Sequence, residues 1–299
     1  MEKVAVILIN YNGKKYNDAC IASVLESKDV ETRAIVVDNA STDDSLMLLT
    51  EKWGKNPQVS IISMKENTGF SGGNNAGIRQ ALEQGYHYIL LLNNDTEIDA
   101  LAIQKMVACQ KETDSIIVPK IYFADKRDTI WCAGGYLTPI IKKAVQRGNN
   151  RKDTGEFDES GYCSLANGCC VLLTDSIIQK TGMLDERFFL YYEDTEYSMR
   201  ALEKQVKIYY CHDAAVYHKV NGSTGGNDNP ANAYYITRNW LMCNKSHMKG
   251  RFYLFVCYFL VNRTVCGALW VLQGKRELTA ALVKGFRDYL KGKTGKLEG

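Results

Sequence analysis

Length, composition and charge exclude several kinds of protein. The chain has 299 residues, 45% of them hydrophobic and 24% charged, with a net charge of +3. These values are ordinary for a soluble globular protein with one large domain, alone or with an appendage. The ten cysteines contain no CxxC pair, so they do not form the framework of a small disulfide-rich protein or a zinc finger. We therefore expect reduced thiols and a cytoplasmic protein.

The first half of the chain alternates short apolar runs with helical patterns. The runs end in polar residues and are typical of strands buried on both faces of a parallel sheet. They begin at Val4, Ala34, Val59 and Tyr88. We interpret the first run as a strand and not as a signal peptide, because no basic segment or cleavage site accompanies it. The intervening helical patterns, at the spacing of βαβ units, cover residues 16–27, 43–53 and 75–84.

Polar side chains follow three of these strands. Asn10 and Tyr11 follow the first, Asp38 and Asn39 the second, and residues 93–95, Asn-Asn-Asp, the fourth. Ligands of open α/β sheets bind at the carboxyl ends of the strands, so we expect these ends to converge on one crevice. The last segment suits a divalent cation, which takes few carboxylates and completes its shell with water and phosphates; a turn or a helix cap is the alternative.

The second half of the chain is less regular. Strands are expected at 115–119, 170–174 and 207–211, with a loop-rich segment at 124–161. The glycine- and asparagine-rich segment 221–230 is expected to be a lid near the site. His218, just before it, is either a second metal ligand or a structural histidine.

The C-terminal part is basic and aromatic. Residues 238–299 hold 12 Lys/Arg against 3 Asp/Glu, a net charge of +9 that leaves −6 for residues 1–237. Two apolar runs, 252–261 and 265–272, flank Arg263. A single membrane span would place Arg263 near the bilayer centre at a cost of about 2.5 to 3.5 kcal/mol. We expect a pair of helices that pack on the domain, form a homodimer interface, or lie in a membrane interface.

The glycine-rich segment 67–77 lets the backbone approach a ligand, and the helix that follows would turn its N-terminal amides toward phosphate. It is not a GxGxxG fingerprint, and residues 292–296 lack the spacing of a P-loop. Both observations weigh against an NAD enzyme or an ATPase.

Residues 185–200 set carboxylates and arginines among aromatic side chains. Aromatic walls desolvate a carboxylate and raise its pKa toward the range of a general base, and Glu193 and Asp194 are adjacent, so they cannot both ionise without repulsion. The alternative is the solvated acidic face of a helix.

Five segments, taken in order, carry a resemblance to a known family. They are Tyr11-Asn12, 37–43 (Val-Asp-Asn-Ala-Ser-Thr-Asp), 67–75 (Asn-Thr-Gly-Phe-Ser-Gly-Gly-Asn-Asn), 92–96 (Leu-Asn-Asn-Asp-Thr), and 191–196 (Tyr-Tyr-Glu-Asp-Thr-Glu) with Arg200. This order resembles the family 2 glycosyltransferases of GT-A fold, in particular a bacterial rhamnosyltransferase-like branch. The resemblance implies a Rossmann-like, mixed and mainly parallel sheet flanked by helices. It also implies a catalytic domain over residues 1–225, followed by the lid and a helical extension over 226–299.

The resemblance also implies roles for individual residues. Asp194 matches the catalytic base, with Glu193 beside it, and the first position of the family's metal-binding Asp-x-Asp is Asn93, so the site has one negative charge fewer. The remaining roles are nucleotide binding by Tyr11, Asp38, Asn74 and Asn75, binding of Mg²⁺ or Mn²⁺ by Asp95 and His218, and donor or acceptor contacts by Asn93, Asn94, Glu196 and Arg200.

The function implied is an inverting transfer of a sugar from a nucleotide-diphosphate donor to a hydroxyl of a glycan or a polyprenyl-linked glycan in cell-surface polysaccharide synthesis. The first expectation for the donor is dTDP-rhamnose, followed by UDP-hexoses or galactofuranose. No nucleic-acid partner is expected, and the basic tail suits the inner face of a membrane. Two other functions stay open: a nucleotide-sugar-binding protein without turnover, and a sugar nucleotidyltransferase, which would need a glycine-rich, arginine-bearing loop after the first strand.

Overall fold

The central sheet of the computed structural model, which describes residues 1–219 and 229–297, has its longest run of neighbours in the order β10-β7-β6-β12-β4-β1-β2-β3. The strands are β1 (Glu2–Asn10), β2 (Val30–Asp38), β3 (Val59–Ser63), β4 (Tyr88–Asn93), β5 (Thr96–Ile98), β6 (Ile116–Phe123), β7 (Lys126–Ala133), β8 (Gly135–Leu137), β9 (Ala144–Gln146), β10 (Arg151–Lys152), β11 (Gly161–Cys163), β12 (Cys170–Thr174) and β13 (Ile208–His218). The helices are α1 (Asn17–Leu25), α2 (Ser45–Trp53), α3 (Gly69–Glu83), α4 (Ala102–Thr113), α5 (Asp175–Thr181), α6 (Glu193–Glu203), α7 (Pro230–His247), the short η1 (Lys249–Arg251), α8 (Phe252–Leu272) and α9 (Arg276–Leu290).

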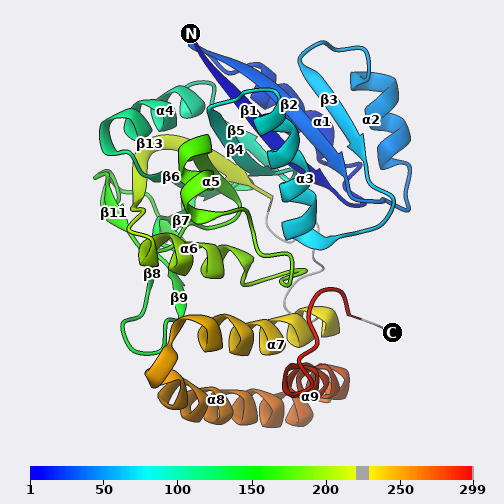
Figure 1. Cartoon of the computed structure of the whole chain (residues 1–299), viewed down its shortest axis with the longest axis vertical. Coiled ribbons are helices and arrows are strands. Elements are labelled where there is room, and N and C mark those ends of the chain that lie inside the picture. The colour runs from blue at the N-terminus through cyan, green and yellow to red at the C-terminus, as the bar shows by residue number, and fades with distance from the viewer. Residues whose placement is uncertain (220–228, 298–299) are drawn as a thin grey trace.

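Strands β3, β2, β1 and β4 are parallel, and β12 runs antiparallel between β4 and β6. Strand β13 is parallel to β6 and antiparallel to β5 and β11. Alternate residues of β1 enter opposite cores: Val4 and Val6 pack in one cluster, Ala5 and Ile7 in the other. Both faces of the sheet are therefore covered, as the continuous apolar runs predict. The prediction of a mixed, mainly parallel sheet flanked by helices is confirmed (Figure 1).

Three expectations about the elements were wrong in detail. Helix α3 begins at Gly69 and not at Asn75, because tertiary contacts described below cap its glycine-rich first turn. The segment 124–161 contains β7 to β10 in place of continuous loop. The two apolar runs around Arg263 form the single helix α8 and not a pair, since nothing between them breaks a helix. The expected lid, 221–230, lies largely outside the described residues.

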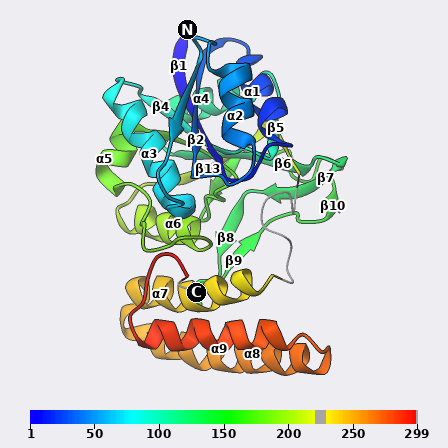
Figure 2. The same ribbon diagram turned by 90° about the vertical axis from the view of Figure 1, so that its right-hand side faces the viewer.

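The C-terminal helices form a layer of their own (Figure 1). Helix α7 lies against the α/β part, and α8 and α9 cover its other side (Figure 2). Trp240 and Leu241 of α7 pack with Phe255 and Phe259 of α8 in a separate core. Among the described residues, one helical stretch, Lys249–Leu272, is long and apolar enough to cross a membrane.

Candidate active site

The carboxyl ends of β1, β2 and β4 are tied together by buried amides. Asn10 Nδ2 donates to Asp38 Oδ1 over 2.6 Å, and Asn10 Oδ1 accepts from Asn17 Nδ2 over 2.9 Å. Asn94 Nδ2 donates to Asn17 Oδ1 over 2.7 Å. The predicted convergence of these strand ends is confirmed. The Asn94 amide is buried and bonds within the protein, and its contact with donor or acceptor stays a prediction.

The two residues predicted to bind the nucleotide base differ in solvent exposure. Tyr11 keeps 44% of its surface exposed, whereas Asp38 is 1% exposed. The second oxygen of Asp38, Oδ2, accepts from the amide of Ser41 over 3.1 Å. Tyr11 therefore presents an open aromatic face, while Asp38 shapes the turn after β2.

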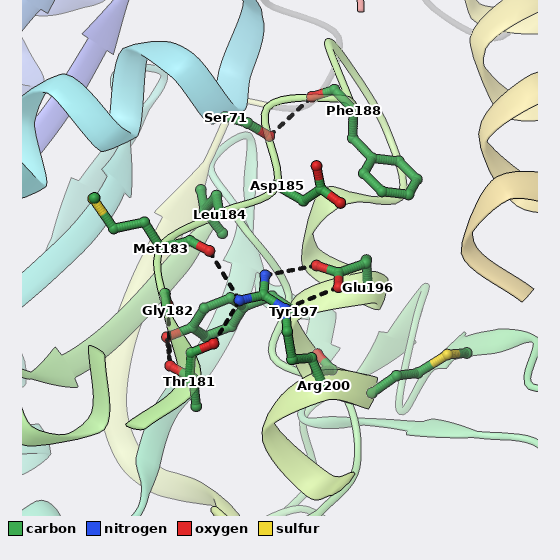
Figure 3. Close-up of polar contacts among 12 residues, drawn as sticks. Ser71, Thr181, Gly182, Met183, Leu184, Asp185, Phe188, Glu196, Tyr197 and Arg200 are labelled. Carbon is green, nitrogen blue, oxygen red and sulfur yellow. Dashed lines mark hydrogen bonds and ion pairs between the residues drawn. The ribbon is translucent and has the colours of Figure 1, made fainter. Parts of the chain in front are cut away.

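The first turn of α3 is capped by other parts of the chain. The amide of Phe70 donates to the Phe189 carbonyl over 2.8 Å, and Ser71 Oγ donates to the Phe188 carbonyl over 2.9 Å (Figure 3). Gly69 has φ +76° and sits against Phe189, where a Cβ would collide with the carbonyl oxygen, so glycine is required there. The amide of Gly69 is also used, by Asn67 Oδ1 at 2.9 Å. The amides of Gly69 and Phe70 are therefore already paired within the protein, and an approach of phosphate to the amides that follow them stays a prediction.

Asn74 and Asn75 are buried in α3. Asn75 bonds the backbone of Leu184 in both directions, donating to its carbonyl over 2.8 Å and accepting from its amide over 3.0 Å. Asn74 Nδ2 donates to the Phe70 carbonyl over 3.0 Å. These contacts make Asn75 a tie between α3 and the segment that leads to α6. The place of Asn74 and Asn75 near the ribose and phosphates stays a prediction.

Asp95 and His218 meet where β5 and β13 pair. His218 Nε2 lies 3.2 Å from Asp95 Oδ1, and both side chains are buried. Burial alone lowers the pKa of His218, but the neighbouring Cys169 and Asp95 outweigh it and raise that pKa to about 10. The spacing fits two adjacent ligands of one cation, since ligand distances of about 2.1 Å at a right angle place donors about 3 Å apart. Within the described residues, no group of three His, Cys, Asp or Glu side chains is arranged to hold a metal.

Glu193 and Asp194 begin α6 after a strained turn. Tyr191 and Tyr192 have φ of 67° and 72°, a left-handed conformation that costs a non-glycine residue about 1 to 2 kcal/mol. Asp194 Oδ2 accepts from the Gly168 amide over 3.2 Å, and Oδ1 from the Thr195 amide over 2.6 Å. Burial raises the pKa of Asp194, and these amides oppose the rise. Asp194 therefore combines a raised pKa with donors that stabilise its ionised form.

The side chain of the neighbouring Glu193 is buried. Its side chain is 7% exposed, and its Oε2 has no hydrogen-bond partner in the described part of the chain. Burial, and then the charge of Asp194, raise the pKa of Glu193 to about 8. At neutral pH Glu193 is consequently mostly neutral.

Residues 168 and 169 contact both the Asp95–His218 pair and the Glu193–Asp194 pair. The Gly168 amide bonds Asp194, and the Cys169 carbonyl accepts from the Asn93 amide over 2.9 Å. The Cys169 thiol lies beside His218. Asn93 is half-buried at the same strand end. The adjacent residues Gly168 and Cys169 therefore contact Asp194 and His218, respectively.

Glu196 and Arg200 do not take part in this arrangement. Arg200 binds both oxygens of Glu196, at 2.9 and 2.7 Å, and donates from Nη1 to the carbonyls of Thr181 and Met183 (Figure 3). Four of its donors are thus used within the protein. The pair thereby holds the turn after α5 against α6, and a contact of Glu196 or Arg200 with donor or acceptor stays a prediction.

Sequence reasoning missed Asn239 of α7. Its Nδ2 donates to the carbonyls of Leu190 and Tyr191, both over 2.9 Å, and its side chain has no exposed surface. Tyr192 stacks on the adjacent Trp240 with ring centroids 6.2 Å apart. Helix α7, although distant in the sequence, thereby holds the strained turn at Tyr191 and Tyr192. A polar residue inside an aromatic stretch was the one signal available.

Residues 5–167 match the family model described as "Glycosyl transferase family 2". The match covers more than half of the chain. The protein belongs to glycosyl transferase family 2. The matched segment contains Tyr11, Asp38 and Asp95 and ends before Glu193, Asp194 and His218.

Two curated relatives of this family 2 protein extend beyond that segment. The low-salt glycan biosynthesis hexosyltransferase Agl10 of Haloferax volcanii is 26% identical over 222 residues, which cover 71% of this chain and 65% of that protein. The dTDP-rhamnosyl transferase RfbF of Shigella flexneri is 24% identical over 253 residues, which cover 82% of this chain and 81% of that protein. The chain thus spans just under two thirds of the length of Agl10.

Solved structures show the fold of this family 2 chain. A structure of S. aureus TarS 1-349 superposes with a TM-score of 0.59 at 17% identity, covering 97% of this chain and 81% of that one. GalNAc-T7 with UDP, GalNAc and Mn²⁺ superposes with a TM-score of 0.64 at 14% identity, covering 82% and 48%. The predicted GT-A fold is confirmed.

Proposed function

We propose that this family 2 protein is an inverting glycosyltransferase that moves a sugar from a nucleotide-diphosphate donor to a hydroxyl of a cell-surface glycan. The observation that carries the proposal is that the adjacent residues Gly168 and Cys169 contact Asp194 and His218, the partner of Asp95. Asp194 offers a proton acceptor, and the Asp95–His218 pair offers ligands for the cation that accompanies a diphosphate. Sugar transfer needs both groups at one anomeric carbon.

Asp194 is the proposed general base. Burial raises its pKa toward the working range, while the amides of Gly168 and Thr195 keep the carboxylate accepting. A base on the face opposite the leaving group favours single displacement with inversion. Glu193, with a pKa of about 8, stays neutral beside it and spares Asp194 a like charge.

Asp95 and His218 would hold Mg²⁺ or Mn²⁺. A bound cation supplies charge neutralisation for the departing nucleoside diphosphate. Because Asn93 replaces one carboxylate of the family's Asp-x-Asp, we expect the protein alone to bind the cation weakly and to bind it better with the diphosphate present.

Tyr11 is the proposed platform for the nucleotide base, because its ring is exposed next to the strand ends. The similarity to RfbF supports dTDP-rhamnose as the first donor to test. Structures with a similar fold contain UDP, which makes UDP-sugars the second set. The acceptor is proposed to be a glycan or polyprenyl-linked glycan at the cytoplasmic side of the membrane.

The test is the release of nucleoside diphosphate from a panel of dTDP- and UDP-sugars, with and without Mn²⁺. We expect Asp194→Asn to lower turnover by about 10² to 10⁴-fold while donor affinity stays near that of the wild type. Asp288→Asn is the matched control, since Asp288 is a buried aspartate of α9 that bonds Tyr234. Pyrophosphate in place of nucleoside diphosphate would identify a nucleotidyltransferase. Donor binding without any product would leave only a binding protein.

A further inference from the structure

The outer face of α8 is apolar and exposed along its whole length. Val261 and Val265 are 67% and 53% exposed, and their side chains lie one turn apart. Only 17% of the apolar stretch of this helix is buried. The remaining large exposed apolar residues of α8 are Tyr253, Leu254, Leu260, Leu269, Val271 and Leu272. Exposed apolar surface of this extent usually marks a contact with a partner or a membrane.

The opposite face of α8 is committed to the protein. Phe255 and Phe259 are buried against Trp240. Arg263 lies over the same ring, with its guanidinium carbon 5.2 Å from the ring centroid. The one charge within α8 therefore points toward α7 and leaves the outer face uncharged.

The charges that flank this face are all positive. Between Lys245 and Arg276 the sequence contains no Asp or Glu. Lys249 and Arg251 precede α8 and Arg276 follows it, and all three are exposed. An apolar stripe with basic residues at both ends is complementary to a bilayer with anionic head groups.

We propose that the outer face of α8 docks on an anionic lipid bilayer, with the helix lying in the plane of the interface. A spanning helix would have to leave the Trp240 core and carry Arg263 into hydrocarbon. A second copy of the chain is a poorer partner, because either orientation of two α8 helices brings basic ends together. This inference does not depend on the proposed sugar transfer, although docking would bring the site to lipid-linked acceptors.

The experiment is co-sedimentation of the full chain with vesicles of phosphatidylcholine alone or with added phosphatidylglycerol. We expect binding only with the anionic lipid, and weaker binding as salt rises. The double variant Val261→Asp/Val265→Asp should bind about a hundredfold more weakly, since it removes two apolar contacts and adds two repelled charges. Met47→Asp is the matched control, because Met47 is 60% exposed on α2, in the α/β part.

Two variants that each remove one positive charge complete the test. Arg251→Gln and Arg276→Gln should each weaken binding about fivefold, whereas Lys55→Gln, on the exposed loop after α2, should not. Wild-type protein that ignores anionic vesicles at low salt would overturn the proposal, as would binding that survives the double variant. Binding that resists high salt and alkaline carbonate would point to a spanning helix. A dimer that the double variant dissociates, without vesicle binding, would identify a second copy as the partner. Melting-temperature shifts with donors in vesicle-free solution report on the sugar site separately.

Discussion

The contact of Asn239 with the turn before Glu193 predicts that a helix far along the chain controls catalysis. Asn239→Ala removes two hydrogen bonds of 2.9 Å and leaves the carbonyls of Leu190 and Tyr191 without this donor. Leaving each carbonyl unpaired costs about 1 to 3 kcal/mol, so the unfolding free energy should fall by about 2 to 6 kcal/mol. The left-handed Tyr191 and Tyr192 each hold about 1 to 2 kcal/mol of strain. Without the two hydrogen bonds from Asn239, which clamp the turn, that strain favours relaxation of the turn.

Relaxation of the turn would move Asp194, which is two residues beyond Tyr192. A displacement of about 1 Å lowers turnover by about 10²-fold. We therefore expect kcat for nucleoside diphosphate release to fall by that factor while the KM for the donor changes little, because Tyr11 and Asp95 lie on other elements. Hydrogen exchange of residues 189–195 should rise in parallel.

Two further variants separate positioning from stability. Asn244→Ala is the matched control: Asn244 is on the same helix, has no exposed surface, and donates to the Trp240 carbonyl of its own helix over 3.1 Å. It should lower stability without lowering kcat. In the wild-type protein, Asn239 Oδ1 also accepts from Arg238 Nε over 2.9 Å. Asn239→Asp keeps this acceptor but cannot donate to the two carbonyls, so it should behave like Asn239→Ala. If Asn239→Ala loses stability like Asn244→Ala and keeps its kcat, the clamp has no catalytic role.

Three more predictions follow from the site. The pKa of Glu193, raised from 4.5 to about 8, means that the folded state holds this proton more tightly. The contribution of Glu193 to stability is therefore highest below pH 4.5 and falls by at most about 5 kcal/mol as pH rises to 8. Glu193→Gln should remove this slope in thermal melts taken across that range. Asp95→Ala and His218→Ala should each weaken Mn²⁺-dependent donor binding by calorimetry, and activity unchanged by EDTA would contradict the cation site. Arg200→Lys should lower the unfolding free energy by about 2 to 4 kcal/mol in denaturant, because its fork to Glu196 is lost, with donor affinity unaltered.

The strands could be predicted because burial on both faces requires consecutive apolar residues, a pattern that is visible in the local sequence. Every position from Val4 to Leu8 is apolar and buried, and no helix of the surface type has that pattern. The start of α3 has no comparable local sequence pattern. Glycine is a poor helix former, so residues 69–73 read as loop, yet the carbonyl oxygens of Phe188 and Phe189 complete that turn from more than a hundred positions away.

The same distance effect limited the prediction of the site. Residue type and motif order were enough to place Asp95 at a strand end, whereas the helix start at Asp194 was only the alternative to an active-site segment. They did not reveal the partners of a side chain. Asn75 and Arg200 have the chemistry of ligand contacts, but the backbone at 181–184 occupies them. An amide or guanidinium that serves a ligand and one that serves a distant loop look identical in sequence.

The position of α7 also decides how membrane docking can be tested. One side of this helix presents Asn239 to the turn before Glu193, and Trp240 packs against α8. Arg238 links the Gly295 carbonyl, at 2.7 Å, to Asn239 Oδ1, and the Gly295 amide returns to the Arg187 carbonyl at 2.8 Å. A chain that ends before α8 loses the Gly295 contacts and the cover of Trp240. Its activity would fall whether or not a membrane is involved. Point changes on the outer face of α8 leave these contacts in place, so only they separate attachment to lipid from support of the catalytic turn.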